Sequence, residues 1–93
     1  MELNAALEAD FRAQATAQGF PEPMPAPRAA LLNNDTHTHD FTAFIIVLDG
    51  EFTVTTDAGA TTYGPGETFT IVAGTPHAER AGSAGANLLI ARR

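Results

Sequence analysis

Turn-forming residues interrupt the chain at short intervals from Ala29 to its C-terminal end, and these frequent turns limit the folds that the chain can adopt. The turn signals are the stretches NND, DG, DAG, GPG, AGTP and GSAG. Short runs rich in Thr, Val, Ile and Phe lie between them, and these residues favour β-strands. We therefore expect a small all-β sandwich or barrel. Its strands are predicted at about residues 28–33, 36–48 with a kink near 40, 51–57, 60–63, 67–73, 77–81 and 86–92.

The segment ahead of this region predicts a helix. Leu3, Leu7 and Phe11 recur every four residues among helix-forming residues, and Gly19 followed by Pro21 marks where a helix should end. The four prolines that begin with Pro21 predict a stiff, extended connector. The chain then divides into an N-terminal helix (1–20), a Pro-rich connector (21–27) and a β-barrel domain (28–93).

The length and composition exclude several classes of protein. The 93 residues contain no internal repeat, so one domain is expected, and a core of this size often depends on a metal or a second subunit. The five basic residues form no cluster and the net charge is −6, which argues against nucleic acid as a partner. No apolar run approaches the ~20 residues of a membrane span. The N-terminal residues are acidic, unlike a secretory signal, and cysteine is absent. We therefore expect a cytoplasmic protein without a membrane partner.

The Asp49-Gly50 pair lies between two β-rich runs and predicts a two-residue hairpin turn. The resulting register places Leu48 opposite Glu51 and sorts the flanking residues into two faces. The expected core face carries Phe41, Ala43, Ile45, Val47, Phe52, Val54 and Thr56. The opposite face carries Phe44, Ile46 and Leu48 beside polar residues, and it is too apolar to face water. Either the N-terminal helix or a second subunit must cover it, and we expect a homodimer.

All three histidines of the chain fit one candidate metal site. His37 and His39 share the parity of the core face, and two histidines at this spacing lie about 6.5–7 Å apart at the backbone. Their rings can converge on one ion at roughly 2.0–2.2 Å. His77 follows a turn at the end of another predicted strand, which can lie beside the first. Single histidines are more often surface or hydrogen-bonded core residues. However, three buried imidazoles without a metal would need several hydrogen-bond partners in a small apolar interior.

Over residues 31 to 81 the sequence resembles the cupins, small jelly-roll barrels with the motifs G-x5-H-x-H-x3,4-E-x6-G and G-x5-P-x-G-x2-H-x3-N. The resemblance implies a double-stranded β-helix (jelly-roll) barrel of two packed antiparallel sheets. It also implies that the histidines are metal ligands. The residues on the two patterns are His37, His39, Gly50, Gly66, Gly74 and His77, and the departures are Leu31, Val72 and Ala81.

The glutamate of the first cupin motif has no counterpart, because Ala43 or Phe44 stands at its position. A site of three neutral histidines would leave a divalent metal with its +2 charge and open positions, which favours a small, anionic, chelating molecule. By the family resemblance, such sites occur in non-haem iron dioxygenases. We expect iron if the protein is an enzyme, with nickel, zinc, manganese or copper as alternatives. Small-molecule binding or sensing without catalysis, and a purely structural metal, remain open.

Further side chains are candidates for the same site. Glu79 shares the parity of His77 and could act as a fourth ligand or as a base, although a glutamate on a short strand is more often solvated. Residues of the core face are expected to line the pocket: Phe41, Ala43, Ile45, Phe52 and Phe69.

Overall fold

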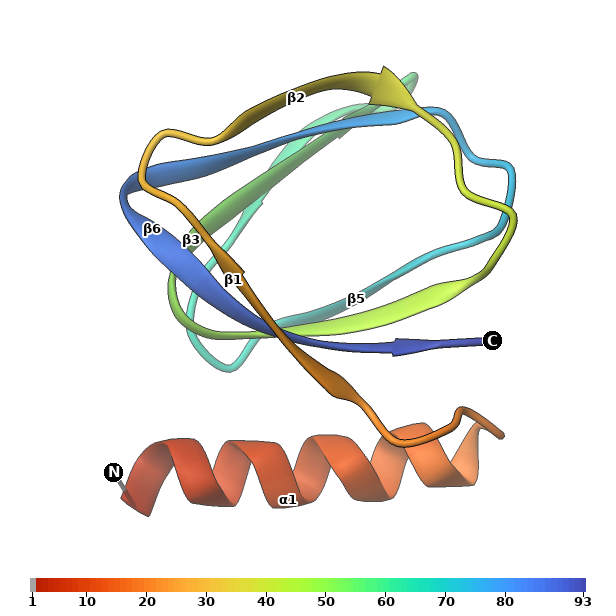
Figure 1. Cartoon of the computed structure of the whole chain (residues 1–93), viewed down its shortest axis with the longest axis vertical. Helices are drawn as coiled ribbons and strands as arrows, with labels where there is room; N and C mark the ends of the chain where they lie inside the picture. Colours follow the sequence, from red (N-terminus) through yellow and green to blue (C-terminus); the bar gives the residue numbers. More distant parts are fainter. Residues whose placement is uncertain (1) are drawn as a thin grey trace.

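A computed structural model describes residues 2–93 of the chain, with side chains described from Asn4 onward, so the side chain of Leu3 lies outside the described residues. The fold is all-β with one helix, and it is a jelly-roll barrel with the helix along one side (Figure 1). Its elements are α1 (Glu2–Ala17), β1 (Met24–Arg28), β2 (Asn33–His37), β3 (Ala43–Thr56), β4 (Gly59–Tyr63), β5 (Thr68–Ile71) and β6 (His77–Arg92).

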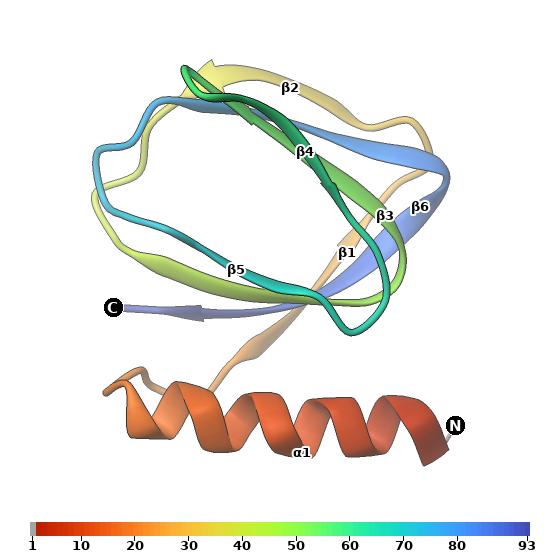
Figure 2. The same ribbon diagram turned by 180° about the vertical axis from the view of Figure 1, so that it is seen from behind.

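Two long strands, β3 and β6, run through both walls of the barrel. The first part of β3 and the last part of β6 pair with each other, and β5 and β1 pair with their outer edges. Beyond the bends, the two strands pair again, and β4 and β2 flank them. All of these pairings are antiparallel, and the two walls face each other in Figure 2. The two packed antiparallel sheets expected from the sequence are therefore present.

The expected hairpin at Asp49-Gly50 is wrong, because β3 continues through both residues. Here β3 shifts its register against β6 and bends. Gly50 has a φ of 81°, and a Cβ at this position would lie 2.1 Å from the carbonyl oxygen of Gly85. Only glycine allows this positive φ and this close backbone approach together. The residues therefore mark a bend where two strands cross, and the separate strands predicted on either side are one strand.

The predicted division of β3 into two faces holds although the turn does not. The irregularity at residues 47–52 changes which residues of β3 point inward, from odd-numbered ones before it to even-numbered ones after it. A two-residue turn would have had the same effect on the two faces. The core inside the barrel consists of Ala26, Ala43, Ile45, Val47, Phe52, Val54, Ile71, Ala86, Leu88 and Ile90. Thr56 is half-buried and lies outside this cluster.

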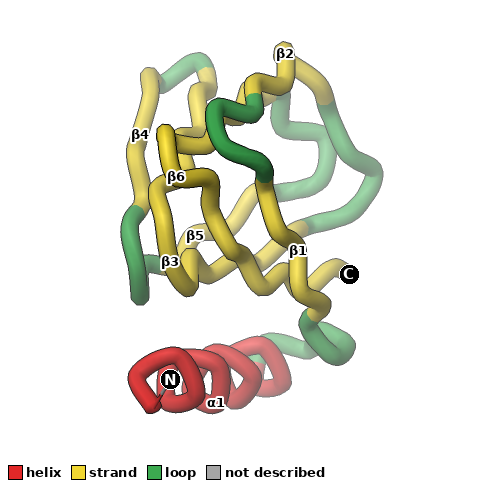
Figure 3. Tube along the Cα trace, turned by 60° about the vertical axis from the view of Figure 1, so that its left-hand side comes forward, coloured by secondary structure: helices red, strands yellow, loops and turns green. Residues whose placement is uncertain are grey.

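Helix α1 lies alongside the barrel (Figure 3), and its side chains cover the outer apolar face. Phe44 and Ile46 are buried there against α1, and the rings of Phe11 and Phe44 stack with centroids 4.6 Å apart. Phe20, just beyond the helix, stacks on the same ring at 5.7 Å. This face is not free for a second subunit, so it no longer supports the homodimer that we expected to bury it.

Other segments also differ from the sequence prediction. β6 runs from His77 to Arg92 as one strand, where two strands at 77–81 and 86–92 were expected. The Pro-rich connector is extended as expected, but residues 24–28 form β1 and pair with β6, whereas residues 29–32 are not strand. β1 pairs with β6 along one edge only, and an edge strand tolerates proline because one side of it needs no N–H donors. The strand predicted over 36–48 is interrupted between His37 and Ala43.

Among residues 2–93, no helix is long and apolar enough to cross a membrane.

Candidate metal centre

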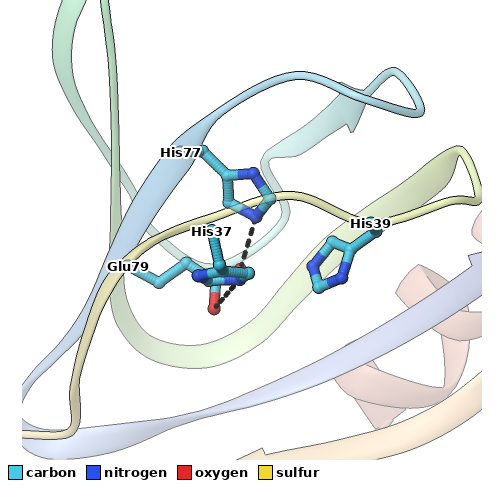
Figure 4. A group of neighbouring side chains, drawn as sticks. All are labelled: His37, His39, His77 and Glu79. Atoms are coloured by element: carbon cyan, nitrogen blue, oxygen red, sulfur yellow. Dashed lines mark ion pairs between the residues drawn. The ribbon is translucent and has the colours of Figure 1, made fainter.

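The pairing of β2 with β6 brings two of the histidines together. His37 is the last residue of β2, His77 is the first residue of β6, and their Cα atoms are partners across the sheet. Glu79 lies two residues further along β6, so its side chain points to the same face as that of His77. His39 follows β2 in the loop that leads to β3. Strand pairing and the period of two thus bring His37, His77 and Glu79 together, and the loop after β2 adds His39 (Figure 4).

The four side chains converge closely enough to hold one ion. One candidate ligand atom from each of His37, His39, His77 and Glu79 lies within 4.8 Å of all the others. The ring centroids of His37 and His77 are 4.4 Å apart, and that of His39 lies 4.8 Å and 5.0 Å from them. The three histidines that the sequence singled out are therefore neighbours, and Glu79 joins them.

Hydrogen bonds to the backbone determine which ring nitrogen of His37 and of His77 can bind a metal. Nδ1 of His37 lies 2.7 Å from the carbonyl oxygen of Asp35, and Nδ1 of His77 lies 2.9 Å from that of Thr75. A carbonyl oxygen only accepts hydrogen bonds, so each Nδ1 must carry the proton. In the neutral ring, Nε2 then presents a lone pair, which is the arrangement commonly found in metal-binding histidines.

The Nε2 atom of His77 shows that a cation fits this site. It is buried and has no hydrogen-bond partner among the described residues. Its nearest charged neighbour is Oε2 of Glu79, 3.3 Å away. A lone pair and a carboxylate oxygen are both acceptors, so without a proton or a cation between them this buried contact is unfavourable. The donor set of three imidazoles and a carboxylate suits a divalent transition metal.

Asn34 orients the carboxylate of Glu79. Its Nδ2 donates to Oε1 of Glu79 at 3.3 Å, and the same Oε1 lies 3.8 Å from Nε2 of His37. The side chain of Glu79 is only 11% exposed, so the expectation of a solvated glutamate does not hold. The sequence did not single out Asn34, because its parity differs from that of His37. A register irregularity between them brings both side chains to the cavity.

His39 is half-buried, and its ring stacks on Phe41 with centroids 4.6 Å apart. Burial lowers the pKa of His39 below the usual histidine value, and the neighbouring His77 and His37 lower it further. Glu79 acts in the opposite direction with a smaller effect. Ligation requires a neutral imidazole, so this direction favours metal binding.

The cluster opens into a cavity of about 180 Å³. Phe41, Ala43 and Ile45 line it, and so do two arginines that the sequence analysis did not consider, Arg28 and Arg92. Two residues proposed for the pocket lie elsewhere. Phe52 is part of the barrel core and is 1% exposed, and Phe69 stacks on Tyr63 with centroids 4.1 Å apart. The side chains of Phe52 and Phe69 both point into the barrel, but the core extends further along the barrel than the cavity does.

A family model described as "Cupin domain" matches residues 31–90. The chain belongs to the cupin family. In this cupin, Ala43 lies in the cavity wall at the position of the motif glutamate, and the carboxylate beside the histidines comes from Glu79 on β6.

Solved structures with the same fold carry different names. A protein of unknown function from Rhizobium leguminosarum bv. viciae is 23% identical with a TM-score of 0.66, covering 87% of this chain and 90% of that one. The polyketide cyclase RemF from Streptomyces resistomycificus is 25% identical with a TM-score of 0.61, covering 83% and 58%. A structure of the DMSP lyases RdDddP and RnDddQII gives 21% identity and a TM-score of 0.67, covering 74% and 36%. The chain therefore spans about a third of the matched lyase chain. No curated protein matches the sequence.

Proposed function

We propose that this cupin holds one divalent transition metal between His37, His39, His77 and Glu79 and binds a small anionic molecule beside it. The buried Nε2 of His77, which faces the Glu79 carboxylate at 3.3 Å and has no hydrogen-bond partner among the described residues, carries the proposal. A cation between these atoms would satisfy both acceptors. Iron, nickel, zinc, manganese and copper all accept such a donor set.

The exposure of the cluster favours ligand binding over a purely structural metal. Structural sites are closed by four protein ligands and exclude solvent. Here His37 and His39 are half-buried and line the cavity, which leaves access to the centre of the cluster. A ligand that enters the cavity would therefore meet the ion directly.

A dioxygenase-like reaction with iron is the candidate activity, and small-molecule binding without turnover is the alternative. A bound divalent ion would polarise a ligand oxygen and, as iron, would supply redox chemistry. The histidines and Glu79 would hold the ion, while Phe41 and Ile45 would limit the access of water to the ligand. The similar structures include a lyase and a cyclase, so the fold alone does not select a reaction. Oxygen uptake by the iron-loaded protein separates the two alternatives.

Metal content tests the proposed centre. The untagged protein, purified without chelator, should contain close to one equivalent of a divalent transition metal by elemental analysis. His37→Ala, His39→Ala and His77→Ala should each lower this content by about tenfold or more, because the chelate loses a ligand. Thr38→Ala, which changes an exposed residue between two of the histidines, is the matched control and should keep its metal. Full metal content in all three histidine variants would contradict the proposal.

A further inference from the structure

Two of the five basic residues of the chain line the cavity of the candidate metal centre. Arg28 is the last residue of β1, and Arg92 is the last residue of β6. The protein has a net charge of −6, so most of its surface disfavours anions. A cavity with two guanidinium groups is a local exception that would attract them.

Both guanidinium groups retain free hydrogen-bond donors. Among the described side chains, neither arginine has a carboxylate at ion-pair distance, whereas Arg12 on α1 pairs with both Glu8 and Glu22. Within residues 4–93, whose side chains are described, the Arg28 guanidinium donates to the carbonyl oxygen of Pro27 alone. Arg92 lies over the ring of Phe41 with its Cζ 5.6 Å from the centroid. A guanidinium carries five N–H donors, so most of them are available to a ligand.

The two arginines reach the cavity from different directions. Arg28 pairs with Ala86 in the middle of β6, and Arg92 lies six residues further along the same strand. Six residues of strand span about 20 Å. Because both side chains nevertheless line one cavity of about 180 Å³, they extend toward it from positions far apart along β6. A ligand in the cavity can meet both of them.

The remaining walls restrict the ligand further. Ile45, Ile71 and Ile90 are buried side chains of the cavity wall, so the body of the ligand must be apolar. Glu79 already places a negative charge beside the histidines, which reduces the charge of a bound divalent ion to about +1. A singly charged carboxylate is tolerated there better than a phosphate dianion. The planar fork of arginine also matches a carboxylate in geometry.

From these observations, we infer that the cavity selects a small carboxylic acid with an apolar body, and that Arg28 and Arg92 bind its carboxylate. The inference rests on the proposed function, since the acid would lie beside the metal centre. It assigns the recognition of negative charge to the arginines and not to the metal alone.

Benzoate and benzamide form a probe pair of matched shape that differs in charge. Calorimetric titration of the nickel-loaded protein should show benzoate binding about tenfold or more tightly than benzamide. Arg28→Gln and Arg92→Gln should each weaken benzoate binding by about tenfold, the usual effect of losing a charged hydrogen bond, and leave benzamide binding unchanged. Arg28→Lys and Arg92→Lys keep the charge without the fork and should give intermediate affinities.

Arg80→Gln is the control, because it removes the same charge from an exposed position on β6 outside the cavity. It should leave benzoate affinity unchanged. Equal affinities for benzoate and benzamide, an equal effect of Arg80→Gln, or tighter binding of phenyl phosphate than of benzoate would each overturn the inference. So would the absence of benzoate binding to protein with full metal content. Metal content measured on the same samples separates this failure from a failure of the proposed centre.

Discussion

At the scale of single residues, the contact between His77 and Glu79 fits either a metal site or an ordinary ion pair. Nδ1 of His77 donates its proton to the carbonyl oxygen of Thr75. The nature of the contact therefore depends on whether a proton or a metal ion lies between Nε2 and the Glu79 carboxylate. A second proton on the ring would make the contact an ion pair. A metal ion would make both atoms ligands. Substitution of the carboxylate by an amide separates these cases, because an amide can donate a hydrogen bond but binds metal poorly.

Glu79→Gln should change the metal-free and the metal-loaded protein in opposite directions. The amide N–H can donate to the free lone pair of His77, so the metal-free variant should melt at a higher temperature than the wild type. Loss of the charged ligand should lower metal affinity by about 10–100-fold. Glu51→Gln, at an exposed position on β3, serves as control and should change neither quantity. A lower melting temperature with unchanged metal affinity would indicate an ion pair with a protonated His77.

Leu31 occupies the position of the first glycine in the cupin motif, and it is the only non-glycine residue with a positive φ (59°) among the described residues. The left-handed conformation costs a branched residue roughly 1–2 kcal/mol. Because the side chain is 72% exposed, little packing would be lost on its removal. Leu31→Gly should therefore raise the melting temperature by a few degrees, after the entropic cost of glycine is subtracted. Leu32 has no positive φ, so Leu32→Gly relieves no strain and should lower the melting temperature. A higher melting temperature of Leu32→Gly would contradict this explanation.

At the scale of elements, the bends of β3 and β6 explain which parts of the fold the sequence predicted. Alternation identified the inner and outer residues of β3, because a bulge and a two-residue turn shift the period in the same way. It could not distinguish the two, since Asp49-Gly50 is compatible with both. The choice depends on Gly85, which lies 35 residues later and packs against Gly50. Contacts between distant glycines leave no local pattern.

The crossing of β3 and β6 should tolerate only glycine at position 50, because any Cβ there would collide with the backbone of β6. In Gly50→Ala, the Cβ would lie 2.1 Å from the Gly85 oxygen and 2.8 Å from Cα of Ala86, which backbone atoms cannot accommodate without moving. We expect misfolded protein or a loss of stability of several kcal/mol. Gly74→Ala provides a matched control, because Gly74 has nearly the same φ (82°) but nothing within 4 Å of its Cβ position. It should cost only the backbone strain, about 1–2 kcal/mol. Similar chemical-denaturation midpoints for the two variants would argue against the close approach.

The candidate site was predictable to the extent that it depends on strand alternation and pairing. His37, His77 and Glu79 follow from these two rules. Asn34 does not, because an irregularity in β2 changes its parity. Arg28 and Arg92 were also missed, since arginines at strand ends are usually solvated, and only the closure of the barrel brings them to one cavity.

At the scale of the whole molecule, the candidate metal centre and α1 secure opposite parts of a small barrel. Helix α1 packs on the outer face of one sheet through Phe11, Ala15 and Leu7. The histidine cluster joins β2, the loop after it and the start of β6, which belong to the other wall. Among the described strands, β2 pairs only with β6, and its register is irregular. A bound ion would therefore add a second connection between this edge strand and β6.

The stability supplied by the metal should depend on pH, because the ion competes with protons for the imidazoles. At a free metal concentration of 100 times Kd, binding adds about 2.7 kcal/mol, which corresponds to a rise in melting temperature of roughly 10–20 °C for a domain of this size. An ordinary histidine titrates near pH 6.5. The pKa of His39 is lowered in the folded chain, chiefly by burial, so the unfolded chain takes up this proton at a higher pH than the folded chain does. The stability of the metal-free protein that depends on neutral His39 is thus present above about pH 6.5 and is lost as pH falls through the folded value.

The metal-loaded protein should lose stability more steeply over the same range, because every ligating histidine must remain neutral for the ion to stay bound. We expect melting curves recorded with and without added Ni²⁺ to differ by roughly 10–20 °C at pH 7.5 and to coincide by about pH 5, where imidazoles with ordinary pKa values are protonated. His77→Ala should show no nickel-dependent rise at either pH, whereas Thr38→Ala should behave as the wild type does. A nickel-dependent rise that stays constant down to about pH 4 could not come from histidine ligands, and it would place the ion elsewhere in the barrel.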